Sequence, residues 1–145
     1  MAEACLQAQD IYGIDVNLLL CAAWCAGGGY RLDANRLAEL DEHCRVWREQ
    51  VITPLRRQRR AWKNDAQRRA DYSAIKRIEL EAEREQLERL ERALGVLPDR
   101  PGNTDLLRDN LVLVCEYFDA GRRIADALVA GLEPGAQSVA RNPPD

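Results

Sequence analysis

Histidine is almost absent from this chain, because His43 is the only one among 145 residues. Any catalytic dyad or triad with an imidazole base would therefore depend on His43. The sequence has no G-x-S-x-G turn for a nucleophile, and neither GxxxxGK[ST] nor GxGxxG for phosphate. The three glycines at 27–29 follow an expected helix rather than a strand, which favours helix termination. We therefore expect no enzymatic activity and no cofactor, with His43 at the surface or at its boundary.

Cysteine is present in an odd number, which excludes complete pairing within one chain. The five positions are Cys5, Cys21, Cys25, Cys44 and Cys115. No secretory pattern precedes them, so we expect a bacterial-type, reducing cytoplasm. Cys21 and Cys25 with His43 and Cys44 would supply four zinc ligands, but paired ligands of structural zinc sites usually come from tight turns rather than one apolar helix. We expect no metal.

Long apolar runs and strand-like alternation are also missing. The longest apolar run, residues 16–26, has about eleven residues, well short of the roughly 20 that span a bilayer, so no membrane segment is expected. Nearly every long segment has helical period instead. The sequence predicts an all-α fold: a compact helical bundle with a central apolar helix, a long charged helical hairpin and a frayed C-terminal tail. We expect one domain over residues 1–132 and a flexible tail over 133–145.

The first half of the chain offers three helices and one ambiguous proline. A helix over 3–12 ends at Gly13, and Asp15 can cap a second helix that is apolar on nearly all sides. Asp33 can cap a third, whose Leu37, Leu40, Cys44 and Trp47 recur at helical spacing. Pro54 removes a backbone donor, so either a kink or a break is expected near Thr53.

The second half predicts two helices joined by a loop. The first covers 74–94, with a leucine seam at Leu80, Leu87, Leu90 and Leu94. Residues 95–103 form the loop. The last helix is expected to run from 104 to 132 without interruption across Gly121, because its apolar residues hold one face.

The segment RRQRRAWK, residues 56–63, places five cations around one tryptophan in a chain of net charge -3. Counted from Trp47 at about 100° per residue, Arg56, Arg60 and Lys63 oppose the apolar side, which is typical of a solvated face. No acid lies between Glu49 and Asp65. The like charges need a counter-charge, which is either the Glu-rich helix that follows or an external anion. The candidate interaction residues are Arg56, Arg57, Arg59, Arg60, Trp62 and Lys63.

A second candidate site surrounds the apolar helix. Its residues are Asp10, Asp15, Asn17 and His43. Capping of helix ends explains the first three adequately. A small-ligand or enzyme site built from them is the alternative.

The stretch CLQAQDIYGIDVNLLLCAAW, residues 5–24, resembles the core signature of a small proteobacterial family, a domain of unknown function. WREQVITPLRRQRR, residues 47–60, adds to the resemblance, which extends to about Leu94. It implies a helical cytoplasmic protein and transfers no site residues. Members commonly carry an aromatic-rich segment before this motif, whereas Met1 lies four residues before Cys5, so we expect a different start or a shortened chain.

These observations favour a non-enzymatic helical interaction or adaptor protein with a protein partner or as a homodimer. RNA or ribosome association through residues 56–63 is the alternative, and it predicts affinity that falls steeply with salt. A small-ligand binder or enzyme around the central helix is the second alternative.

Overall fold

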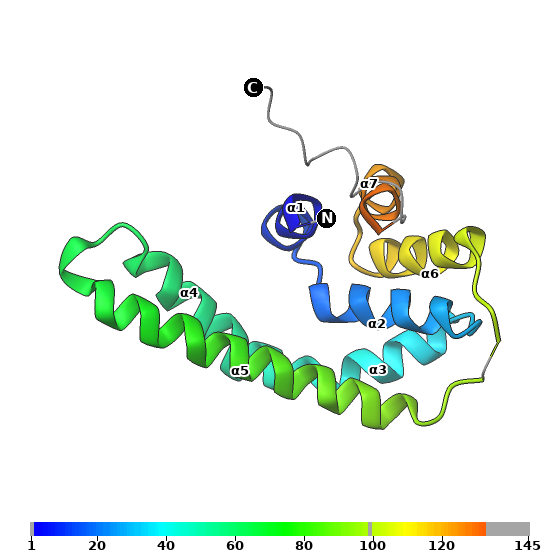
Figure 1. Cartoon of the computed structure of the whole chain (residues 1–145), viewed down its shortest axis with the longest axis horizontal. Helices are drawn as coiled ribbons and strands as arrows, with labels where there is room; N and C mark the ends of the chain where they lie inside the picture. The colour runs from blue at the N-terminus through cyan, green and yellow to red at the C-terminus, as the bar shows by residue number, and fades with distance from the viewer. Residues whose placement is uncertain (1, 99, 133–145) are drawn as a thin grey trace, which may run out of the picture. The chain divides into compact units, whose positions relative to one another are not determined.

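The structure is a computed structural model that describes residues 2–98 and 100–132 (Figure 1). These residues form helices and their connections, and no strand occurs among them, which confirms the all-α fold class. The elements are α1 (Ala2–Tyr12), α2 (Val16–Gly27), α3 (Ala34–Trp47), the π-helical turn η1 (Arg48–Ile52), α4 (Thr53–Trp62), the 3-10 turn η2 (Ala66–Arg68), α5 (Arg69–Leu94), α6 (Thr104–Tyr117) and α7 (Arg122–Leu132).

The chain divides into two compact units. The terminal unit combines residues 1–37 with 96–145, and the hairpin unit consists of residues 38–95. We had expected a single domain over residues 1–132, and this expectation stays a prediction. The tail expected over residues 133–145 lies outside the described residues.

The terminal unit is a helical bundle with an apolar core. In it α2 packs on α6, α6 on α7, and α1 on both α7 and α2. Leu18 of α2, Leu111 and Val114 of α6, and Leu128 of α7 are almost completely buried. The central apolar helix expected at this position is therefore α2, although Trp24 on one of its stripes is 49% exposed.

Aspartates begin α2 and α3 as the sequence predicts. The Oδ1 atom of Asp15 accepts a hydrogen bond of 2.9 Å from the backbone N–H of Asn17. Asp33 does the same for the N–H of Arg36 at 2.7 Å. Each carboxylate satisfies one of the backbone donors that a helix leaves unpaired in its first turn.

The C-terminal end of α2 depends on two glycines. Gly29 has a φ of 72°, and the N–H of Tyr30 then donates to the carbonyl of Cys25 at 2.8 Å, which closes the helix. Gly102, in the loop before α6, lies so close to α2 that an added Cβ would fall 2.0 Å from the carbonyl oxygen of Ala26. The end of α2 and this loop can therefore pack so closely only because residue 102 is a glycine, which has no side chain.

The uninterrupted helix expected over 104–132 is wrong. The chain leaves the helix after Tyr117, because Asp119 takes a φ of 56° and the N–H of Ala120 donates to the carbonyl of Cys115 at 2.7 Å. This is the same closing geometry as at Gly29, with an aspartate in the left-handed position. The apolar period continued across the break because both α6 and α7 bury one face.

The hairpin unit contains the longest helix, α5, with α4 packed against it. The helical backbone is not broken by a loop at Pro54, and the expected kink stays a prediction. The chain makes the π-helical turn η1, in which the N–H of Thr53 donates to the carbonyl of Arg48, and then continues as α4. A π turn inserts an additional residue, so the proline occupies the first turn of α4, where its missing donor is not needed.

α5 begins at Arg69, five residues before the predicted start, after Asp65 accepts a hydrogen bond from the N–H of Gln67. The predicted leucine seam is only partly correct. Leu90 and Leu94 are buried, but Leu80 is 51% exposed. The buried face of α5 runs instead through Glu79, Ala82, Gln86, Leu90 and Leu94.

Candidate functional site

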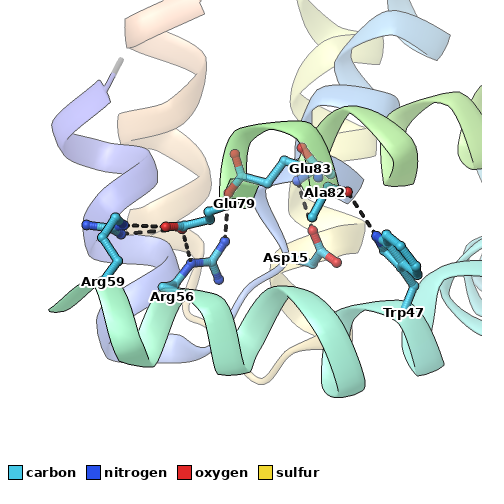
Figure 2. Close-up of polar contacts among 8 residues, drawn as sticks. Asp15, Trp47, Arg56, Arg59, Glu79, Ala82 and Glu83 are labelled. Atoms are coloured by element: carbon cyan, nitrogen blue, oxygen red, sulfur yellow. Dashed lines mark hydrogen bonds and ion pairs between the residues drawn. The ribbon is translucent and has the colours of Figure 1, made fainter. Parts of the chain in front are cut away.

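The basic helix α4 is partly neutralised by its neighbour in the hairpin. Arg56 pairs through Nε with Glu79 at 3.3 Å and through a terminal nitrogen with Glu83 at 2.9 Å. Arg59 also donates through Nε to Glu79, as Figure 2 shows. Two arginines on successive turns of α4 therefore share acids on successive turns of α5.

Burial makes this cluster stronger than an ordinary surface pair. The side chain of Glu79 is 7% exposed, and those of Arg56 and Arg59 are 19% and 20% exposed. The hydrogen bond to Glu79, assisted by one to Tyr72, raises the pKa of Arg59 above its ordinary value. Removal of one member would leave buried charge without a counter-ion, which is strongly destabilising in proteins.

The position of Arg56 differs from the sequence-based expectation. Arg56 was expected on the solvent face with Arg60 and Lys63, but it lies half-buried against α5. At about 100° per residue Arg56 lies about 60° from Arg59 around α4, so the side of the helix that faces α5 includes both. Of the two counter-charges considered, the Glu-rich helix therefore compensates Arg56 and Arg59.

The acids that perform this role are Glu79 and Glu83. Glu85, farther along α5, pairs instead with Arg89 at 3.0 Å within its own helix. Glu79 carried a usable signal, because it lies one turn from Glu83 and two turns from Gln86 on one side of α5.

Two tryptophans make contacts within the hairpin unit. Trp47 donates its indole N–H to the carbonyl of Ala82 at 2.9 Å, and the guanidinium of Arg89 lies 4.3 Å from the centre of its ring. Trp62 is half-buried, with the guanidinium of Arg68 5.4 Å from its ring centre. One side of the Trp62 ring is thus already occupied by an arginine, which limits its use as a stacking surface.

Other cations of the hairpin stay at the surface. Arg57, Arg60 and Lys63 are exposed on α4, and Arg69, Lys76 and Arg77 are exposed on the first half of α5. We call residues 56–77 the basic end of the hairpin. It contains nine Lys and Arg and two Asp, a net charge of +7, which the charges of Glu79 and Glu83 reduce to +5. The segment therefore keeps a net positive charge after these two acids are counted, and exposed Arg57 and Lys63 contribute to it.

A second buried ion pair lies where α3 meets η1. Arg48 donates to Asp41 at 2.7 Å, and the side chain of Asp41 is 9% exposed. The same nitrogen lies 3.9 Å from the Sγ atom of Cys44. The sequence-based candidates did not include these residues, although their seven-residue spacing places them on one helix face.

The four residues of the candidate cleft are used differently from one another. Asp15 and Asn17 are buried and hydrogen-bonded to each other at the start of α2. Asp10 is exposed on α1, and His43 is exposed on the part of α3 that belongs to the hairpin unit. Capping of α2 accounts for Asp15, and the placement of the four residues adds no support for a catalytic role.

The cysteines are free thiols, four of them buried. A hydrogen bond from Cys21 lowers the pKa of Cys25, and burial raises the pKa of Cys115 to about 11. Across residues 2–98 and 100–132, no group of three or more His, Cys, Asp or Glu side chains has the arrangement of a metal site. In the same part of the chain, no helix combines the length and the apolar composition that crossing a membrane requires.

Comparison with known proteins identifies a family for most of the chain. Residues 1–90 match the sequence profile of DUF2390, described as a protein of unknown function. No curated protein and no solved structure matches the chain. The chain belongs to the DUF2390 family, and this agrees with the expectation of a family without an assigned activity.

Proposed function

We propose that this member of the DUF2390 family is a non-enzymatic interaction module of the cytoplasm. In this proposal the basic end of the hairpin binds an acidic segment of a partner protein. The observation that supports it is the excess of exposed cations that remains after the internal pairs are formed. Arg57 and Lys63 belong to this excess, whereas Arg56 and Arg59 are already engaged with Glu79.

The division of labour on α4 supports a surface rather than a purely structural helix. Its inner cations hold α4 on α5, so they fix the backbone from which the outer cations project. A rigid row of cations loses little conformational freedom when a partner binds, and complementary charge accelerates association. Arg57 and Lys63 are exposed at the middle and at the C-terminal end of this helix, which suits an extended acidic segment along it.

An acidic protein is favoured over RNA by two observations. The chain carries a net charge of -3, so the +7 of the basic end is balanced by -10 elsewhere, and nucleic-acid binders more often present a basic domain. Trp62 is half-buried beneath Arg68 and not open for base stacking on that side. Binding of RNA is therefore treated as the alternative result of the test.

The test compares two anionic probes on the full chain. Fluorescence anisotropy would measure binding of a labelled Glu-rich peptide and of a labelled single-stranded RNA over a series of salt concentrations. The variant Arg57→Glu/Lys63→Glu removes surface charge without touching the internal pairs. The matched control, Arg122→Glu/Arg123→Glu, makes the same change of charge on exposed residues of α7.

We expect the peptide to bind the wild type and the control alike, and the Arg57/Lys63 variant at least about tenfold more weakly. Tighter binding of RNA, with loss in the same variant, would replace the acidic protein by phosphate as the ligand. Absence of binding to both probes at low salt, or equal loss in the control, would overturn the proposal.

A further inference from the structure

Leu80 of α5 is a large apolar residue surrounded by cations. It is 51% exposed. On a helix the surface neighbours of a residue lie three and four positions before and after it. For Leu80 these neighbours are Lys76, Arg77, Glu83 and Arg84. We call Leu80 together with Lys76, Arg77 and Arg84 the Leu80 patch.

The cations of the Leu80 patch have no counter-charge within the described chain. Lys76, Arg77 and Arg84 are exposed, and across residues 2–98 and 100–132 none of them forms an ion pair. Glu83, the one acid among the neighbours of Leu80, is already paired with Arg56 at 2.9 Å. The patch therefore keeps the positive charge of all three cations beside one apolar side chain.

Other arginines of the same helix are compensated internally. Arg89 pairs with Glu85 at 3.0 Å, and Arg92 lies 3.7 Å from the same carboxylate. Glu81 is exposed and follows Leu80 directly, but it lies about 100° away around the helix. Acids are thus available on α5, but they do not neutralise the cations that surround Leu80.

This combination suits a ligand that is acidic and apolar at once. A protein segment supplies carboxylates and apolar side chains a few residues apart. The aliphatic stems of Lys and Arg can enlarge the apolar surface around Leu80 while their charged heads contact acids. RNA offers phosphates without aliphatic side chains, and one leucine among cations is not the broad apolar face of a helix that lies in a membrane surface. A protein segment is therefore favoured.

We propose that the acidic segment of the partner carries a large apolar side chain that packs on Leu80, with carboxylates on either side of it that pair with Lys76, Arg77 and Arg84. Lys76 and Arg84 are eight residues apart, about 12 Å along the helix. About four residues of extended chain are enough to cover this length. The inference rests on the proposed function for the acidic character of the partner, and it adds the apolar side chain between the acids.

The test compares two labelled peptides of equal charge on the full chain. Both are Glu-rich, and they differ only at one central position, which is Leu in the first peptide and Gln in the second. Fluorescence anisotropy over a series of salt concentrations measures both affinities. We expect the Leu peptide to bind the wild type about fivefold more tightly than the Gln peptide. This ratio should persist as salt rises, because salt screens the ion pairs but not the apolar contact.

Two exposed apolar residues of α5 provide the variant and its matched control. Leu80→Ala should reduce the ratio of the two affinities to about one, because the apolar contact is lost. Ile78→Ala should leave the ratio unchanged. Ile78 is 49% exposed, but none of its surface neighbours is a cation. They are Ala74, Ile75, Glu81 and Ala82.

The charges of the patch are tested separately. Lys76→Gln/Arg77→Gln should weaken the binding of both peptides at least about threefold at low salt, because both carry the acids that these side chains pair with. The ratio between the peptides should stay near its wild-type value. Circular dichroism verifies that all variants remain helical.

Equal affinity of the two peptides for the wild type, or a ratio that survives in Leu80→Ala, would overturn the inference. If the affinities were equal and both fell in Arg57→Glu/Lys63→Glu, the proposed function would stand without it. If the ratio depended on Leu80 while that variant bound both peptides normally, the Leu80 patch would stand and the surface on α4 would fail. Absence of peptide binding at low salt would overturn both. Leu80-dependent binding to vesicles of anionic phospholipid in place of the peptides would overturn the choice of a protein segment.

Discussion

The terminal unit and the hairpin unit bury different chemistry. In the terminal unit the buried side chains are mainly Leu, Val, Ala and Cys, and one buried amide, Asn110, connects several segments. Its Nδ2 donates to the carbonyls of Ala22 and Tyr30, and its Oδ1 accepts from the N–H of Leu32. In the hairpin unit the buried face of α5 carries Glu79 and Gln86.

The difference follows from what each unit can enclose. Several helices surround α2 and α6, so apolar burial supplies most of the stabilisation there. A pair of helices such as α4 and α5 encloses little volume, and α4 itself has no fully buried side chain. Its attachment therefore relies on charged and hydrogen-bonded groups, which stabilise only while every partner is present.

The largest expected effect is in the apolar core. Leu111→Ala removes a side chain with 0% exposure and should lower the free energy of unfolding by roughly 2–5 kcal/mol. Amide hydrogen exchange should accelerate in α2, α6 and α7. Leu20→Ala, at an exposed position of the same unit, should cost about 1 kcal/mol or less. Equal effects of the two changes would contradict the assigned core.

Glu79→Gln tests the ionic counterpart in the hairpin unit. The change keeps the shape but removes the charge shared by Arg56 and Arg59, so we expect a loss of about 2–3 kcal/mol, reduced by the partial solvation of the arginines. Exchange should accelerate in α4 and α5. Glu81→Gln, an exposed acid on the same helix, is the control and should change stability by about 0.5 kcal/mol or less.

Alkaline pH should act on the terminal unit through Cys115. Burial raises the pKa of this thiol from 9.0 to about 11, so the unfolded chain releases the proton first and stability falls as pH rises through this range. The expected loss is about 2 kcal/mol between pH 9 and pH 11. Urea unfolding of the wild type and of Cys115→Ala at a series of pH values would isolate the contribution of Cys115, because the variant lacks this thiol. If the free energy of unfolding fell equally with pH in both proteins, Cys115 would not be the cause.

Trp47→Phe should have the smallest effect. It removes the hydrogen bond to the carbonyl of Ala82 while retaining most of the apolar ring, a loss of about 1 kcal/mol. Trp24→Phe, at a ring that is 49% exposed in the terminal unit, should be nearly neutral. Thermal unfolding monitored by circular dichroism would compare them. A larger loss of stability in Trp24→Phe than in Trp47→Phe would contradict the expectation that Trp47 contributes more.

Helix positions were largely predictable because their signals are local. Asp15, Asp33 and the glycines at 27–29 act through backbone groups a few residues away, and the structure confirms them as helix boundaries. The break at Asp119 was missed because an aspartate in the left-handed conformation has no signal as strong as glycine. The start of α5 was missed because its first turns are polar.

The chain's order of residues by itself determined the all-α class, the apolar character of α2, and the unmixed positive charge of residues 56–63. Only the tertiary structure decided which cations are used internally. Arg56 and Arg59 meet Glu79 and Glu83 across the hairpin, whereas Arg57 and Lys63 stay exposed on the same helix. A helical wheel places side chains around one helix, but only the packing of α4 on α5 decides which of them face a partner.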